Sequence, residues 1–105
     1  MIIITGSVLT KPETHSELVA LCTQHSARSR AEPGCIAHNV HVDCENPARL
    51  VFLEQWADAA AVRDHFAVPE SGGFVKKIAS LAAASPEMAL FAADALPVKA
   101  IPTPS

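Results

Sequence analysis

The spacing of hydrophobic and polar side chains divides the first part of the chain into a strand, a helix and a second strand. Residues 2–9, IIITGSVL, are rich in β-branched side chains, which predicts a strand in which Gly6 marks a bulge or a close approach by a ligand. Pro12 then opens a segment whose side chains share one helical face at Leu18, Leu21, Cys22 and His25. This spacing predicts a helix that runs to about residue 31, where the sequence EPG ends it.

Two segments with alternating side chains predict a β-hairpin in the middle of the chain. Residues 35–43 and 49–56 have the pattern of strands, and Asn46-Pro47 is the strongest turn signal between them. In the first of these strands, one face is expected to carry Ile36, His38, Val40 and Val42. The other face is expected to carry Cys35, Ala37, Asn39, His41 and Asp43.

The second half of the chain predicts a helical crossover and a last strand. Asp58 is expected to cap a helix that Pro69 interrupts. Helical spacing resumes over residues 74–82, and we expect the glycine pair at 72–73 to break the helix. Residues 87–93 suit a helix or a strand by propensity, and we assign them to a strand because it completes a four-stranded sheet.

The resulting order, βαββαβ, is that of an α+β protein with a ferredoxin-like antiparallel sheet. Both helical segments would cover one face of the sheet, and a second copy of the sheet is the simplest cover for the other face. Residues 1–96 form the predicted domain. Residues 97–105, which are rich in proline, form a predicted extended or disordered tail.

Composition narrows the class of protein. Half of the 105 residues are hydrophobic and 18% are charged, which is apolar for a small monomer and favours a homodimer. A net charge of −3 without a basic stripe argues against nucleic-acid binding. The apolar N-terminus lacks a basic leader and is too short to span a bilayer, and cysteines without CxxC spacing suit reduced thiols. We therefore expect a cytoplasmic protein that binds no nucleic acid and no membrane.

The stretch HNVH places His38 and His41 three residues apart in a predicted strand. Side chains at i and i+3 of a strand lie on opposite faces, so the pair cannot hold one ion without a bulge, and we predict no metal site. His38 would either face a cavity or be a hydrogen-bonded sheet histidine. The sequence contains no phosphate-binding loop, dinucleotide fingerprint or nucleophile elbow.

The ordered motifs from residue 32 to residue 66 resemble the antibiotic biosynthesis monooxygenase (ABM) family, including its quinol-monooxygenase-like members. The matching elements are EPGC at 32–35, the D-x-x-N-P turn at 43–47, the strand end E-x-W at 54–56 and the A-x-x-x-H helix at 61–65. The resemblance extends over residues 2 to about 93. It implies a protomer that pairs sheet to sheet into a dimeric α+β barrel, with a cavity between helices and sheet.

Seven side chains are candidates for that cavity. We predict His65 as the catalytic base and His38 as the second candidate, because histidine takes a proton near neutral pH. Predicted substrate contacts come from aromatic, amide and imidazole groups at Trp56, Phe52, Asn39, Phe66 and His25. Core packing is the alternative for the aromatic residues, hydrogen-bonded burial for the histidines, and the opposite sheet face for Asn39. Glu54 is expected to form a structural ion pair or hydrogen bond across the dimer.

Three functions remain open from the sequence. The leading hypothesis, which the resemblance implies, is a cofactor-independent monooxygenase whose substrates are O2 and a small aromatic phenol or quinol. The second is haem degradation, for which relatives use a helix histidine, a tryptophan and an asparagine on the first strand, but residues 2–9 contain no asparagine. The third is a dimeric ligand-binding protein without turnover, in which Trp56 and His65 are packed with no opening.

Overall fold

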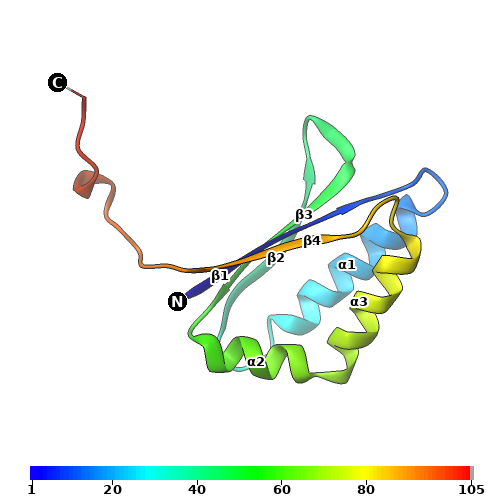
Figure 1. Cartoon of the computed structure of the whole chain (residues 1–105), viewed down its shortest axis with the longest axis horizontal. Coiled ribbons are helices and arrows are strands. Elements are labelled where there is room, and N and C mark those ends of the chain that lie inside the picture. Colours follow the sequence, from blue (N-terminus) through cyan, green and yellow to red (C-terminus); the bar gives the residue numbers. More distant parts are fainter. Residues whose placement is uncertain (105) are drawn as a thin grey trace.

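The computed structural model describes residues 1–104 and places four strands and three α-helices in two layers (Figure 1). In chain order these are β1 (Ile2–Leu9), α1 (His15–Ser29), β2 (Cys35–Asp43), β3 (Asn46–Trp56), α2 (Ala59–Ala67), α3 (Pro69–Leu81) and β4 (Glu87–Ala92). A short 3₁₀ helix, η1 (Val98–Ala100), follows in the tail. All three α-helices lie on one face of the sheet, and no element of the described chain covers the other face (Figure 1).

The sheet is antiparallel throughout, with the strand order β2-β3-β1-β4. This is the predicted ferredoxin-like βαββαβ arrangement, with the second crossover made of two helices instead of one. The assignment of the last segment to a strand is confirmed, because β4 pairs with β1 along its whole length. Gly6 pairs in regular register with Phe52 and Met88, so the strand has no bulge at this glycine.

Helix α1 is shorter than predicted at both ends. The Thr14 N–H donates to the Lys11 carbonyl, so residues 11–14 form a turn that contains Pro12 before the helix begins. The Thr14 hydroxyl donates to the Leu81 carbonyl at 2.8 Å instead of capping α1. Contacts with a distant segment therefore set where the helix begins, and local spacing could not reveal them.

Strand β2 contains an irregularity that changes which face its first residues occupy. Cys35 pairs with Trp56 and His38 pairs with Glu54, so three steps along β2 match two steps along β3. Cys35 consequently packs beside Trp56 on the helix-covered face, whereas Ile36 is 58% exposed. The predicted alternation is wrong at this end of the strand, because a strict period of two cannot reveal an extra residue.

The chain bends between α2 and α3 at Val68, whose extended backbone suits a residue before proline. Pro69 opens α3, where its missing N–H removes no helical hydrogen bond. The break predicted at the glycine pair 72–73 does not occur, because α3 runs through both glycines. The cap predicted for α2 is confirmed, since the Asp58 side chain accepts a hydrogen bond from the Ala61 N–H at 2.9 Å.

Two peripheral segments complete the chain. The hairpin turn lies at residues 44–45, and the predicted turn residues Asn46 and Pro47 already belong to β3. After β4 the tail leaves the two layers and extends away from them (Figure 1). Its apolar side chains are exposed, with Val98 at 91%.

The buried apolar side chains between sheet and helices form two clusters. The larger consists of Val8, Leu18, Cys22, Leu50, Phe52 and Ile78. The smaller surrounds the fully buried Trp56 and includes Ile4, Ala61 and Val62. The ring of His38 lies edge-on to both Phe52 and Trp56, at centroid distances of 5.7 and 6.2 Å. A polar group therefore separates the two halves of the core.

Candidate functional site

A cavity of about 210 Å³ lies between the sheet and the helices. Gly6 forms part of its floor, and the cavity is also lined by the residues that pair with this glycine, Phe52 and Met88. A close approach of a ligand to Gly6 therefore stays a prediction, with this cavity as its place. Phe66 and Phe74 add aromatic walls, and the polar groups of the lining include His25, Glu54, His65 and Ser71.

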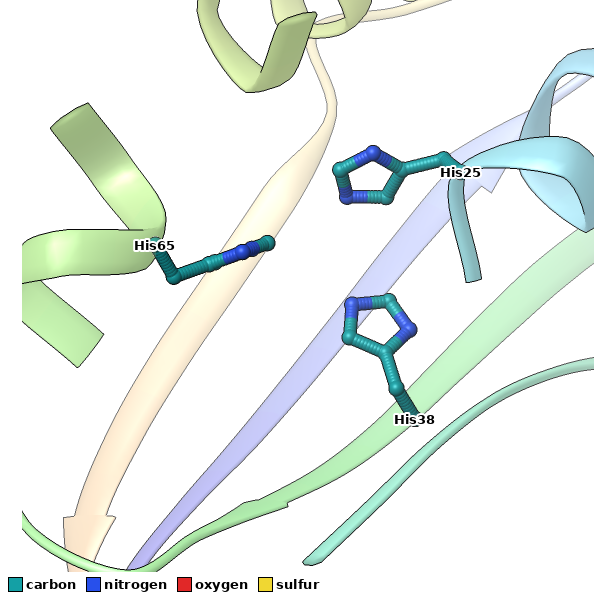
Figure 2. Close-up of side chains that lie close together, drawn as sticks. All are labelled: His25, His38 and His65. Carbon is teal, nitrogen blue, oxygen red and sulfur yellow. The ribbon is translucent and has the colours of Figure 1, made fainter. Parts of the chain in front are cut away.

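Three histidines from three elements meet beside this cavity, with their rings turned toward one another (Figure 2). His25 comes from α1, His38 from β2 and His65 from α2, and their exposed fractions are 8%, 0% and 4%. One ring nitrogen of each lies within 4.8 Å of one ring nitrogen of the other two. Every Nδ1 atom is hydrogen-bonded to a side chain of α1 or of the loop after it. His25 and His65 line the cavity, so their Nε2 atoms are the nitrogens left for a ligand, whereas His38 Nε2 is buried 3.2 Å from Glu54 Oε1.

Glu32 orients His65. Its Oε1 atom lies 2.9 Å from Nδ1 of His65, and an ionised carboxylate can only accept a hydrogen bond. Nδ1 therefore carries the proton, and Nε2 of the neutral ring has a free lone pair. The Trp56 indole lies against the same ring, with centroids 4.5 Å apart. A carboxylate-held imidazole with its second nitrogen unprotonated is the arrangement of a general base.

His38 and Glu54 form a second, more deeply buried pair. Ser26 Oγ lies 2.8 Å from His38 Nδ1, and Glu54 Oε1 accepts a hydrogen bond from Trp56 Nε1 at 3.0 Å. His38 Nε2 is 3.2 Å from Glu54 Oε1, but it has no well-formed hydrogen bond, so this contact is mainly electrostatic. The predicted structural pairing of Glu54 is found within its own chain, with His38 and Trp56, and a pairing across a dimer stays a prediction.

The charge on Glu54 is favoured by its neighbours. Burial raises the pKa of this carboxyl, but His38, the Trp56 N–H and the nearby His65 together outweigh burial and hold the pKa below its usual value. Glu54 is 6% exposed and lines the cavity. The cavity wall therefore carries a negative charge on Glu54, which His38 and Trp56 already stabilise.

Arg28 sets the proton position of His25. Its Nη2 atom lies 2.8 Å from His25 Nδ1 and 3.4 Å from Ser71 Oγ. Arginine can only donate, so Nδ1 of His25 accepts and the ring proton is on Nε2. Burial lowers the pKa of His25 to about 3, with smaller contributions from His38, His65 and Arg28. The ring is neutral at pH 7 and stacks on Phe74 at a centroid distance of 3.9 Å.

The spacing of the three histidines suits a metal ion, but the tautomer of His25 does not. A ligating nitrogen needs a free lone pair, and Arg28 keeps a proton on Nε2 of His25. Metal-bound histidines usually donate their second N–H to an acceptor. Glu32 provides such an acceptor for His65, whereas Arg28 does the opposite for His25. The cluster therefore presents one hydrogen-bond donor and one acceptor rather than a set of three metal ligands.

The structure brings some of the predicted site residues to the cavity. Phe52, Phe66, His25 and His65 line it. His38 and Trp56 have no exposed surface and lie behind Glu54, which both of them contact. Asn39 is exposed on the opposite sheet face, which is the second of the two placements left open for it. His41 shares that face, so the two histidines of HNVH point apart as predicted.

Three polar residues of the site were missed by the sequence analysis. Arg28 follows His25 at i+3 on α1, and this spacing is the one local signal that links the two side chains. Glu32 belongs to the EPG helix stop and to the EPGC motif, and neither pattern indicates that its side chain reaches α2. Ser71 lies inside α3 and is 5% exposed, and no periodicity indicated that it would be buried.

Fold and site together define a small α+β protein with a one-sided ferredoxin-like sheet and a buried histidine cluster beside an apolar cavity. Residues 1–77 match the family described as Antibiotic biosynthesis monooxygenase, and the chain belongs to this family. The YcnE protein of Bacillus subtilis is 30% identical over 77 residues, which cover 73% of this chain and 81% of YcnE. An uncharacterised protein of Synechocystis is 32% identical over 90 residues; the match covers 86% of this chain and 61% of that protein.

Solved structures share the fold. A crystal structure of an antibiotic biosynthesis monooxygenase matches with a TM-score of 0.81 and 29% identity, over 92% of this chain and 100% of the other. Rv0793 from Mycobacterium tuberculosis matches with a TM-score of 0.84 and 19% identity, over 90% and 96% of the two chains. Within residues 1–104, no helix has both the length and the apolar character needed to cross a membrane.

Proposed function

We propose that this protein is a cofactor-independent monooxygenase that oxidises a small aromatic phenol or quinol with O2. The observation that carries the proposal is the pair of His65 and Glu32 at the wall of an apolar cavity. Membership of the monooxygenase family supports oxygen chemistry at this cavity. The cavity volume of about 210 Å³ suits a small aromatic molecule rather than a large ligand.

In the proposed reaction, the substrate supplies the electrons and the protein moves a proton. Nε2 of His65 takes the phenolic proton, and the Glu32 carboxylate stabilises the resulting imidazolium. The anion passes one electron to O2, and the two radicals combine. For a quinol, the overall reaction converts one quinol and one O2 into one hydroxyquinone and one water. One oxygen atom enters the ring and the other leaves as water, so the substrate supplies all four electrons.

The other predicted residues take supporting roles in this proposal. Phe52 and Phe66, together with Phe74, hold the aromatic ring and exclude water. Trp56 fixes the His65 ring from behind. His38, the second candidate for the base, has no surface in the cavity and instead helps to hold Glu54 in its charged form.

We also propose that the protein is a homodimer whose subunits meet at the uncovered sheet face. The strand register places apolar side chains on this face from three strands, at Ile3, Val51, Leu53 and Phe91. Leu53 is 43% exposed and Phe91 is 53% exposed. Exposed apolar side chains of this kind are unfavourable in water, and an identical face on a second copy would cover them. Asn39 lies on this face, so its amide would meet the partner subunit rather than the substrate.

The test is oxygen uptake by the purified protein with 1,4-naphthalenediol, measured above the uncatalysed rate. His65→Ala should lower the rate about 10²- to 10⁴-fold, the usual contribution of a general base. His15→Leu is the matched control, because His15 lies at the start of α1 outside the cavity lining. Uptake by the wild type that does not exceed uptake by His65→Ala would refute the proposal and favour ligand binding without turnover.

A further inference from the structure

We propose that His25 and Arg28 form an anion-stabilising pair that binds the ionised oxygen of the substrate opposite His65. The inference rests on the proposed function and deepens it, because it assigns a residue to the phenolate that His65 creates. His25 and His65 both line the cavity, and their rings approach each other from α1 and α2 (Figure 2).

The proton positions make the two facing nitrogens complementary. Arg28 donates to Nδ1 of His25, so Nε2 of His25 is a donor. Glu32 accepts from Nδ1 of His65, so Nε2 of His65 is an acceptor. One hydroxyl group can therefore donate to His65 while it accepts from His25.

The spacing fits a single oxygen atom. Two hydrogen bonds of about 2.8 Å that meet at a roughly tetrahedral angle place their outer atoms about 4.6 Å apart. One ring nitrogen of each of the three histidines lies within 4.8 Å of one ring nitrogen of the other two. We therefore expect a single oxygen atom bound between His25 and His65 to contact both rings.

The surrounding charges suit an anion that forms in place. Transfer of the hydroxyl proton to His65 breaks the O–H bond, forms an N–H bond and leaves a negative oxygen. The new imidazolium faces Glu32, and the new oxyanion faces a His25 N–H that is polarised by Arg28. Glu54 keeps its existing contacts with His38 and Trp56. The imidazolium therefore faces a carboxylate, and the oxyanion faces a polarised N–H donor.

This geometry favours one class of ligand, a flat ring that carries an acidic hydroxyl group. The ring would occupy the apolar part of the cavity between Phe52, Phe66 and Phe74. A methyl ether of the same ring cannot donate to His65, and its oxygen cannot become an anion. We therefore expect selection for phenols and enols over their ethers.

The probe is 4-nitrophenol, titrated into the full-length protein at a pH just below the pKa of the free phenol. The wild type should increase the phenolate absorption band on binding, and 4-nitroanisole should not compete. His25→Leu should lower the ionisation constant of the bound phenol about tenfold or more, as expected for a lost hydrogen bond to a charged group. Thermal unfolding of each variant confirms that it is folded.

Arg28 acts through His25, so we expect its variants to change the phenolate band according to whether they can still donate to Nδ1 of His25. Arg28→Met should reduce the phenolate band, because nothing then keeps the His25 proton on Nε2. Arg28→Lys should restore part of the band, since an ammonium group can also donate to Nδ1. Arg63→Met removes an exposed arginine of α2 and should leave the band unchanged.

The outcomes separate this inference from the proposed function. Equal phenolate bands in the wild type and His25→Leu would overturn the inference and leave the monooxygenase proposal intact. Quinol turnover without binding of 4-nitrophenol would do the same. A visible Co²⁺ spectrum that disappears in His25→Leu would also overturn it, because Nε2 would then be a metal ligand. A phenolate band that depends on His25, without oxygen uptake, would support the inference and refute only the proposed oxidation.

Discussion

At the scale of single residues, partners rather than residue type distinguish the three histidines of the cluster. Arg28 makes His25 a neutral donor, Glu32 makes His65 an acceptor, and His38 is enclosed between Ser26 and the core. The same imidazole group can play each of these parts, because each ring nitrogen changes between donor and acceptor with its surroundings.

A pH dependence of stability follows from the buried, neutral state of His25. Its pKa is about 3 in the folded protein, against an ordinary value of 6.5. Between these values the unfolded chain binds the extra proton, so stability should fall as the pH decreases, by about 1.4 kcal/mol per pH unit. The groups that face His25 are His38, His65, Arg28 and Glu54.

His25→Gln removes this titration and keeps an acceptor for Arg28. Urea unfolding of the wild type should show a steeper loss of stability than His25→Gln between about pH 6.5 and pH 5, above the range in which Glu54 titrates. The other histidines remain in both proteins, so the difference between the slopes reports on His25. Parallel curves would show that His25 is not held neutral in the folded protein.

At the scale of elements, the turn between α1 and β2 organises the site. It places Glu32 beneath His65 and returns the chain to the sheet through Gly34, whose φ of 82° is in the left-handed region. The Gly34 carbonyl accepts a hydrogen bond from the Ala57 N–H at 2.8 Å, which ties the turn to the start of the second crossover. The proposed general base, His65, is therefore positioned by the turn between two elements and not by a helix or strand alone.

Replacement of Gly34 by alanine should destabilise the fold. A Cβ atom there would lie 2.5 Å from the Cβ of Ala61, in addition to the strain of a positive φ. We expect a loss of about 1–3 kcal/mol in the free energy of unfolding, measured by urea titration. Gly72→Ala is the matched control, because its Cβ would meet nothing within 4 Å inside α3. That change should be neutral or stabilise by up to about 1 kcal/mol. Equal effects of the two substitutions would contradict this account.

At the scale of the whole molecule, the sheet has two unlike faces. One is covered by three helices that form the cavity with it, and the other presents apolar side chains to solvent (Figure 1). Asn39 and His41 belong to the second face, so any role they have would concern association rather than chemistry.

The proposed homodimer predicts a mass in sedimentation equilibrium twice that of the 105-residue chain. Leu53→Asp should shift the protein toward the monomer, because a charge would be buried without a partner at the centre of the interface. Val75→Asp is the control, since Val75 is 51% exposed but lies on α3 in the helix layer. A wild-type protein that sediments as a monomer at all concentrations would exclude this assembly.

Local patterns determined the order of the elements, the buried face of α1 that carries His25, and the Asp58 cap of α2, because each depends on spacing along a single segment. The same patterns placed His65 on a helix and Glu54 on a strand. Only the tertiary structure decided the extra residue in β2 and the contacts that Arg28 and Glu32 make with the histidines. These features depend on distances between segments that are far apart in the chain, and the periodicity of one segment contains no information about them.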